Sequence, residues 1–304
     1  MDLVPYRRVI HERLPWMSIE KTIPILEGWS NFIILVNDEY IFRFPRHAQA
    51  RSRAEKEILV LGELSGALDI PVPSVDQSWF PDVEGDLAFI SYRKIVGDAL
   101  SPELTTSREL ATQLGSLLTG IHSFRVPDDL REILTHYSPP EWRQEYVDFY
   151  SWAKQNVYPW VNKEARSHET AIWEGYLDQP LNFCFQPVFV HRDLGAEHIL
   201  CDQQHKVVTG IIDWEDAAIG DPAIDFVGLN IVGGREFIER VLGSYRGTAG
   251  ENFWERLSFY QAIIPYHEYR FGLEIGDDDH IRAALEDIMC RSGIKEKQGS
   301  GVLT

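Results

Sequence analysis

The sequence predicts an α+β protein in which a small antiparallel sheet precedes a larger, mainly helical part. Short apolar runs broken by turn residues fill the first 95 residues, and apolar residues at helical spacing dominate from residue 97 onward. Short β-type segments return only between about 187 and 214. Because 304 residues suit about two domains, we place these at 1–95 and 96–304, with a helical insertion at about 138–182.

A hairpin and a crossing helix account for most of the predicted sheet region. The apolar runs Phe32–Val36 and Tyr40–Phe42 flank the polar segment Asn37–Glu39, which is a hairpin signal. Two further strands are expected at about 74–79 and 86–92, separated by a turn-rich stretch. Between the hairpin and these strands, apolar residues recur on one face of a predicted helix: Ala54, Ile58, Leu61 and Leu64.

Helical signals dominate the rest of the chain. Thr106 and Glu109 frame a capping box. The stretch 138–176 is helical and rich in aromatic residues, which we assign to the core because large aromatics dominate core burial. The polar segment 291–304 is expected to fray. Behind the capping box, apolar residues form one stripe: Leu110, Leu114, Leu117, Leu118 and Ile121.

The charge balance excludes some classes of partner. The chain has 29 basic and 47 acidic residues, a net charge of −18. Binding to nucleic acid or to an anionic membrane needs a basic surface, so we expect neither. A cationic ligand is compatible with this charge, although acidic surfaces more often serve solubility alone.

Cysteine usage and the first residues indicate the compartment. Cys184, Cys201 and Cys290 are odd in number and lack the spacing of a zinc site or a disulfide framework, so we predict buried free thiols in a reducing compartment. The start of the chain has no apolar signal-peptide core, and no stretch approaches the ~18 apolar residues of a membrane span. We therefore expect a cytoplasmic protein.

Two predicted strands direct three side chains of catalytic type towards one point. A strand leads into His191-Arg192-Asp193, and five residues after Asp193 His198 begins another strand. A further apolar segment ends at Asp213. Phosphoryl transfer needs such a set, with one carboxylate to accept a hydroxyl proton and two ligands to hold Mg²⁺ on the phosphates.

The same segment resembles the aminoglycoside phosphotransferase family. The family pattern is H-x-D-x-x-x-x-N/H, then I-D-W/F, then G-D-P-x-x-D; here it occurs at His191–His198, Ile212–Trp214 and Gly220–Asp225. The three motifs follow in the right order within 35 residues. The resemblance covers most of the chain and implies a protein-kinase-like, two-lobed fold. Its amino-terminal lobe would bind nucleotide, and its carboxyl-terminal lobe would carry catalysis and the substrate.

The resemblance implies roles for five residues of these motifs. Asp193 corresponds to the catalytic base, and Asp213 corresponds to the metal-binding Asp of the kinase D-F-G signature. His198 is expected to bind Mg²⁺, with a purely loop-holding hydrogen bond as the alternative; the 2″-aminoglycoside and macrolide branches are similar in having His there. His191 and Asp225 would support the catalytic loop through hydrogen bonds.

A cation and a helix carboxylate are expected beside the phosphates. Arg43 stands where many kinases have a strand lysine, and its fork can bind phosphate or carboxylate bidentately. Glu57 resembles the residue that pairs with this cation, and Glu55 is the competing choice. Trp214 takes the Phe position of the D-F-G signature, whereas Arg192 departs from the family's usual Gly or Asn and is assigned a structural role.

The remaining nucleotide contacts are expected at two segments of the first 95 residues. Gly28–Phe32 begins the hairpin where the family covers the phosphates, and Ser30 and Asn31 can donate hydrogen bonds there. At the hinge between lobes, the backbone from Arg93 to Ile95 would bind the purine, and Tyr92 would flank its pocket. The resemblance leaves GTP and ATP open as donors and slightly favours GTP.

The acceptor is expected to be a small molecule, and acidic residues would attract a cationic one. Tyr266–Gly272 resembles a helix of the 2″-phosphorylating relatives, which favours an aminoglycoside. The acidic run Asp277–Asp279 precedes an apolar stripe, and we assign it to a helix amino terminus. Four carboxylates are the candidate substrate contacts: Glu145, Asp148, Glu268 and Glu274.

These observations support a primary hypothesis and leave alternatives open. The primary one is a phosphotransferase that acts on an antibiotic hydroxyl, using Mg²⁺ and GTP or ATP. A macrolide phosphotransferase is close behind, and a metabolic kinase for an amino alcohol or sugar would use the same motifs, because a fold does not fix its substrate. An inactive, regulatory nucleotide-binding module is the minor alternative. We expect a monomer without nucleic-acid or membrane partners.

Overall fold

A computed structural model describes residues 2–25, 30–81 and 86–291. Gly28, expected over the phosphates, and the predicted turn at 82–85 lie outside these ranges. The strands are β1 Thr22–Ile25, β2 Asn31–Val36, β3 Tyr40–Pro45, β4 Val75–Trp79, β5 Phe89–Arg93, β6 Asp98–Ala99, β7 Val188–Val190, β8 Ile199–Asp202, β9 Val207–Ile211 and β10 Ala218–Gly220. The α-helices are α1 Val4–Arg13, α2 Ala48–Leu64, α3 Arg108–Ser123, α4 Asp128–Ile133, α5 Pro139–Asn156, α6 Lys163–Leu177, α7 Val227–Leu242, α8 Phe253–Ala262, α9 Ile264–Ile275 and α10 Asp278–Arg291.

The α+β prediction is correct, and the first part of the chain forms a five-stranded antiparallel sheet. Its strand order is β1-β2-β3-β5-β4. The predicted hairpin is formed by β2 and β3, with Ile34 opposite Phe42. Asn37 and Asp38 take positive φ angles of 54° and 59° in its turn, a conformation that these two residue types tolerate better than most.

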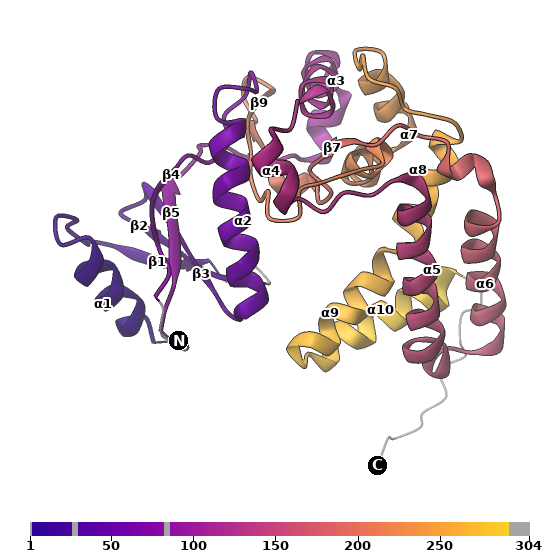
Figure 1. Ribbon diagram of the computed structural model, residues 1–304, viewed down its shortest axis with the longest axis horizontal. Coiled ribbons are helices and arrows are strands. Elements are labelled where there is room, and N and C mark those ends of the chain that lie inside the picture. The colour runs from indigo at the N-terminus through magenta and orange to yellow at the C-terminus, as the bar shows by residue number, and fades with distance from the viewer. Residues whose placement is uncertain (1, 26–29, 82–85, 292–304) are drawn as a thin grey trace. The chain divides into compact units, whose positions relative to one another are not determined.

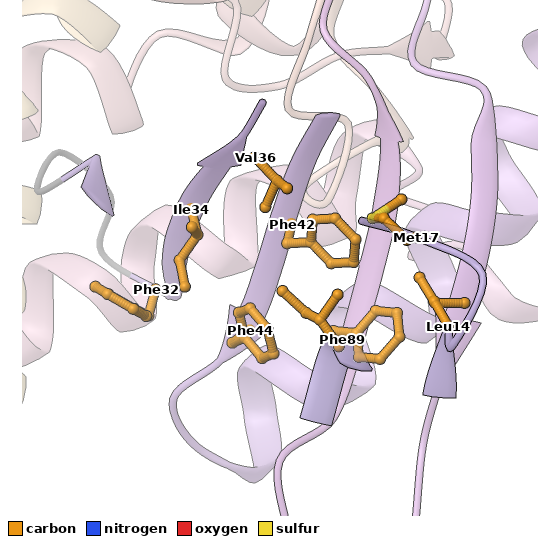
Figure 2. Close-up of a cluster of buried hydrophobic side chains, with 9 residues drawn as sticks. Leu14, Met17, Phe32, Ile34, Val36, Phe42, Phe44 and Phe89 are labelled. Atoms are coloured by element: carbon orange, nitrogen blue, oxygen red, sulfur yellow. The ribbon is translucent and has the colours of Figure 1, made fainter. Parts of the chain in front are cut away.

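Helix α1 packs against one face of this sheet, a role that the sequence left undecided. Ile10 of α1 forms a buried cluster with apolar residues of β2, β3 and β5, and Leu14 and Met17, which follow the helix, complete this cluster. Figure 2 shows Phe42 and Phe44 in this cluster. Because side chains alternate along a strand, the residue between these two phenylalanines points to the opposite face. That residue is Arg43.

Helix α2 lies on this opposite face of the sheet (Figure 1) and holds the partner of Arg43. Its amino terminus is capped by His47, whose side chain accepts the Ala50 N–H at 3.2 Å. The sheet is thus covered on both faces, which agrees with the buried residues along β3.

Past β5 the chain enters two smaller sheets that carry the family motifs. The segment after Arg93 leads into β6, which pairs with β8. The three-stranded sheet has the order β6-β8-β9, and β7 pairs with β10. The expected hinge therefore connects the five-stranded sheet to the strands that flank His198 and Asp213.

By contacts, the chain divides into two compact units. Unit 1 comprises 1–136, 188–219 and 228–247, and unit 2 comprises 137–187, 220–227 and 248–304. The five-stranded sheet and the segment from His191 to Asp213 both belong to unit 1. The predicted division after residue 95 stays a prediction.

Unit 2 has an aromatic core, as the sequence predicted. Tyr176 stacks on Phe259 with ring centroids 3.6 Å apart, and Trp142 and Trp173 are fully buried. Two tryptophans of this stretch differ from the expectation, since 68% of Trp160 is exposed and Trp152 is only half-buried. The predicted helical insertion consists of two α-helices, α5 and α6, joined by a 3₁₀ turn.

Several finer expectations need correction. The capping residue of α3 is Ser107, one position later than predicted, because Thr106 ends a preceding 3₁₀ helix. Of the three thiols only Cys201 is buried; Cys184 and Cys290 are exposed near the ends of helical segments. No helix in the described ranges is both long and apolar enough to cross a membrane.

A close contact between α3 and the end of α7 yields a stability prediction. A Cβ atom at Gly115 would lie 2.3 Å from the Val241 carbonyl oxygen and 2.9 Å from the Tyr245 nitrogen. Gly115→Ala should therefore lower the free energy of unfolding by about 1–3 kcal/mol, the usual cost of overpacking. Gly62→Ala on α2 is the control, since its added Cβ meets nothing within 4 Å. Urea unfolding should show that the control is neutral or slightly stabilised; equal destabilisation of both variants would contradict the prediction.

Candidate active site

The loop after β7 presents Asp193 to solvent. Its backbone turns sharply at Arg192, where φ is 71°. The Asp193 N–H donates to Nδ1 of His191 at 3.3 Å, and Nε2 of His191 lies 3.0 Å from the Ile212 carbonyl oxygen. A carbonyl only accepts, so the His191 proton is on Nε2. His191 thereby ties Asp193 to the residue before Asp213, and the Asp193 side chain stays 58% exposed.

His198 lies between two carboxylates. Its Nδ1 is 2.7 Å from the Asp193 carbonyl oxygen and 3.6 Å from Asp193 Oδ2. Its Nε2 is 3.6 Å from Asp213 Oδ2. The carbonyl can only accept, so Nδ1 carries the proton, and in the neutral ring the lone pair of Nε2 points towards Asp213. All three predicted catalytic and metal-binding side chains are therefore brought together within unit 1.

The environment shifts the pKa values of this group. Partial desolvation raises the pKa of Asp193 to about 6, and the carboxylates of Asp216 and Asp213 act in the same direction, against the opposing effect of His198. Burial lowers the pKa of His198, but Asp193 and Asp213 outweigh it and raise the pKa above its usual value. Burial alone would raise the pKa of Asp213, but the nearby Arg43, His198 and His191 hold this pKa below its ordinary range. Asp213 is thus the carboxylate best kept ionised.

Arg43 joins β3 to α2 and to the loop after β9. Its Nη1 donates to both carboxylate oxygens of Glu57 at 2.8 Å. Its Nη2 donates to Asp213 at 3.0 Å and to Glu215 at 2.9 Å. The Trp214 N–H also donates to Glu57, at 3.1 Å. The side chain expected to meet phosphate is therefore held by three carboxylates and is almost completely buried.

The structure distinguishes the two glutamates that the sequence left open. Glu57 is fully buried and contacts Arg43, whereas Glu55 is exposed and pairs with Arg51 at 3.4 Å on its own helix. Burial raises the pKa of Glu57 to about 7, while Arg43 acts in the opposite direction.

Sequence reasoning missed Glu215. Its side chain is buried, and Oε2 accepts from Arg43 and from Nδ2 of Asn31, the latter at 3.0 Å. The amide of Asn31, expected to donate to phosphate, is therefore directed at Glu215 instead. The available signal was its place in the motif: Glu215 follows Asp213-Trp214, where the D-F-G signature has glycine.

Two groups of side chains could hold a cation. Oxygens of Glu57, Asp213 and Glu215 lie within 4.8 Å of one another, but Arg43 already donates to all three. The pair His198 and Asp213 is more suitable for Mg²⁺, because their 3.6 Å separation is compatible with two ligands of one ion at roughly 2.1 Å each. Carboxylate oxygen is a preferred Mg²⁺ donor, and imidazole is a softer one.

The predicted hinge residues differ in their surroundings. Tyr92 is buried, and burial raises its pKa. Arg93 is exposed and pairs with Glu39 at 2.6 Å. Ile95 is half-buried, and a Cβ atom at Gly210 would lie 2.7 Å from it, so β9 passes close to this segment. Ser30 is half-buried at the start of β2.

The four candidate substrate carboxylates all lie in unit 2, on α5 and α9. Asp148 accepts from Gln144 at 2.9 Å, Glu268 pairs with His280, and Glu274 pairs with Arg270 at 3.3 Å. Glu145 is half-buried on α5. As expected, the acidic run caps a helix, because Asp277 Oδ1 accepts from two backbone N–H groups of α10.

The G-D-P-x-x-D motif lies in the core of unit 2. Asp221 is fully buried, pairs with the buried Arg256, and accepts from Tyr260 at 2.5 Å. It also accepts the Ala223 N–H at 2.9 Å. Asp225, expected to support the catalytic loop, is fully buried in the 3₁₀ helix that follows Asp221.

The five-stranded antiparallel sheet, together with an H-x-D loop whose Asp193 and His198 lie close to Asp213, is the arrangement of a kinase-like phosphotransferase. The comparison with family models agrees: residues 21–260 match the phosphotransferase enzyme family APH. The chain belongs to this family.

Sequence relatives include one enzyme that matches most of the chain. The chain is 24% identical to viomycin phosphotransferase of Streptomyces vinaceus over 259 residues, which cover 83% of this chain and 88% of that enzyme. It is 35% identical to YcbJ of Bacillus subtilis (strain 168) over 124 residues, which cover 38% of this chain and only 40% of YcbJ.

Solved structures share the fold over almost the whole chain. The GDP complex of aminoglycoside 2'-phosphotransferase-IIIa superposes with a TM-score of 0.85 at 24% identity, covering 96% of this chain and 99% of that one. Macrolide 2'-phosphotransferase type I gives a TM-score of 0.77 at 21% identity, covering 94% and 96%. The kinase-like fold expected from the sequence is confirmed.

Proposed function

We propose that this protein transfers the γ-phosphate of GTP or ATP to a hydroxyl group of an antibiotic, with an aminoglycoside as the preferred acceptor. The observation that carries this proposal is the grouping of Asp193, His198 and Asp213, in which His198 lies 3.6 Å from each carboxylate. Family membership supports the reaction class.

Asp193 is the base in this proposal. Its carboxylate is exposed, so an acceptor hydroxyl can approach it, while the His191 and His198 contacts to its backbone fix its position. Fixing the base relative to the nucleotide is the main source of rate in phosphoryl transfer, where positioning and electrostatics dominate.

The donor side is proposed to use Mg²⁺, held by His198 and Asp213. When bound there, Mg²⁺ would neutralise charge on the phosphates. Arg43 supplies a fixed positive charge, Ser30 lies just before β2, and Asn31 is the first residue of this strand. The hinge backbone from Arg93 to Ile95 would bind the purine, and Tyr92 would flank its pocket. The GDP complex of the aminoglycoside relative is consistent with a guanine donor.

The acceptor side is proposed to lie with the carboxylates of unit 2. Glu145, Asp148, Glu268 and Glu274 would attract a cationic antibiotic by opposite charge. Of these, Glu268 already contacts His280 and Glu274 already pairs with Arg270, so a bound polyamine would compete with these two side chains.

An acceptor panel tests the function. The purified protein is incubated with Mg²⁺, with GTP or ATP, and in turn with aminoglycosides, viomycin and macrolides, and nucleoside diphosphate release is measured. Release that depends on an aminoglycoside supports the proposal. Release with macrolides alone, or with amino alcohols and sugars alone, would favour the corresponding alternative. Nucleotide binding without turnover on any acceptor would indicate a regulatory module.

Glu57 and Glu55 on α2 offer a matched pair for testing the Arg43 contact. Glu57→Gln removes one charge from a buried bidentate pair, and such charge-assisted bonds contribute about 1.5–3 kcal/mol. We therefore expect kcat/KM for the nucleotide to fall by roughly 10- to 100-fold. Glu55→Gln, an exposed change two residues away, should leave it within about twofold. Steady-state kinetics with both variants would refute the assignment if their losses were equal.

A further inference from the structure

Glu215 differs from the glycine of the D-F-G signature in a way that has structural consequences. A glycine at this position has no side chain, whereas Glu215 extends a carboxylate into the buried space beside Arg43. One oxygen, Oε2, accepts from both Arg43 and Asn31, and the other lies 3.6 Å from Nη1 of Arg53. The residue thus links β2, β3 and α2 to the loop after β9.

The second amino group of Arg43 is divided between two acceptors. Nη1 is committed to Glu57, and Nη2 is shared between Asp213 Oδ1 and Glu215 Oε2 at 3.0 and 2.9 Å. A lysine at position 43 has a single amino group and no fork, so it could not serve these carboxylates with the same geometry. The arginine and the glutamate therefore depend on each other.

The formal charges in this cluster are unequal. Arg43 faces three carboxylates and Arg53 lies 3.6 Å from one of them, Glu215, so the formal count leaves one negative charge in excess. Of the three carboxylates, Asp213 is the one that also lies near His198, and 34% of its side chain is exposed to solvent. Arg43 donates to Oδ1 of Asp213, whereas Oδ2 is the oxygen near His198, so a cation bound from that side would share the carboxylate with Arg43.

We propose that Glu215 is a positioning residue that holds Nη2 of Arg43, so that Asp213 is released to a divalent cation. Without Glu215, Nη2 would turn wholly to Asp213 and oppose the incoming ion. This inference rests on the proposed function, since it assumes a metal–nucleotide at His198 and Asp213. It assigns Glu215 no contact with the substrate or the metal.

Metal binding itself provides the test. Binding of Mn²⁺ in the presence of the β,γ-imido analogue of GTP or ATP is measured by electron paramagnetic resonance, without turnover. Glu215→Gln should weaken Mn²⁺ binding by about tenfold, the effect of losing one charge-assisted hydrogen bond. In the absence of metal, affinity for the analogue should change little. Unchanged Mn²⁺ affinity would overturn the proposal.

Two further variants separate hydrogen bonding from charge. Asp216→Asn removes the adjacent carboxylate, which is 40% exposed, and its effect on Mn²⁺ should stay below about threefold. Glu215→Asp keeps the charge but shortens the reach to Arg43, so it should weaken Mn²⁺ binding if positioning matters. Wild-type affinity in Glu215→Asp would overturn the proposal, even if Glu215→Gln failed to fold.

A double-mutant cycle tests the dependence on arginine. In an Arg43→Lys background Glu215 has lost the guanidinium to which it hydrogen-bonds. Adding Glu215→Gln there should reduce Mn²⁺ affinity much less than Glu215→Gln does in the wild-type protein. If the effects of Arg43→Lys and Glu215→Gln on Mn²⁺ affinity were additive, the two residues would not depend on each other. The acceptor panel is read separately: wild-type protein that binds the Mn²⁺ complex but phosphorylates nothing would refute the proposed function and leave this inference standing.

Discussion

Asp193→Asn should lower kcat by about 10²- to 10⁴-fold, the range in which a positioned general base contributes. Asparagine keeps the shape of the side chain but cannot take the hydroxyl proton. Because Asp193 projects into solvent and its backbone is held by the two histidines, the fold should be unaffected. Nucleotide affinity, measured by fluorescence titration, should change by less than about threefold.

Glu197→Gln is the matched control for this experiment. Glu197 is exposed on the same loop and carries the same charge, and it is no part of the proposed site. Its kcat should remain within about threefold of wild type. Full activity in Asp193→Asn would remove Asp193 from its role as the base, and equal losses in both variants would point to loop electrostatics instead.

Arg256→Met should lower the free energy of unfolding by about 3–5 kcal/mol, because it leaves a buried carboxylate without its cation. Arg256 and Asp221 are both fully buried, and Arg256 also donates to the Ala249 and Glu251 carbonyls. Urea unfolding followed by near-ultraviolet circular dichroism is the measurement. Arg282→Met, which removes an exposed pair with Asp279, should cost only about 0–1 kcal/mol.

The loss in Arg256→Met should also depend on pH. Burial already raises the pKa of Asp221 above its ordinary value, and Arg256 opposes this rise. Removing Arg256 raises the pKa of Asp221 further. At pH values above this pKa the charged, unpaired Asp221 lowers the free energy of unfolding, and this loss shrinks as the pH falls and Asp221 takes up a proton. The deficit should therefore be smaller at pH 5 than at pH 8. A deficit that is independent of pH would contradict an uncompensated Asp221 charge.

The hairpin, the helix α2 and the H-x-D region could be predicted because each is specified locally. The turn at Asn37 and Asp38 selects a short hairpin, and apolar periodicity places α2. The convergence of Asp193 with Asp213 was foreseeable because each follows a strand. These features depend on residues near one another in sequence, where spacing is informative.

Features that depend on distant contacts were not predictable in the same way. Glu57 and not Glu55 pairs with Arg43, and this depends on how α2 packs against β3, because the two partners lie 14 positions apart in the sequence. The contacts of Glu215 join segments 172 and 184 residues apart. The amino-terminal helix was not predicted for another reason: it spans only Val4–Arg13 and has a single buried residue, Ile10, so its sequence carries little apolar periodicity.

That amino-terminal helix lies outside the stretch that matches the family, which begins at residue 21. A version of the chain trimmed to this boundary would strip the cover from Phe32, Phe44 and Phe89 and leave a bare aromatic surface on the sheet (Figure 2). Exposed apolar areas of this kind promote self-association. A recombinant protein should therefore begin before Val4, well ahead of residue 21, where the family match begins.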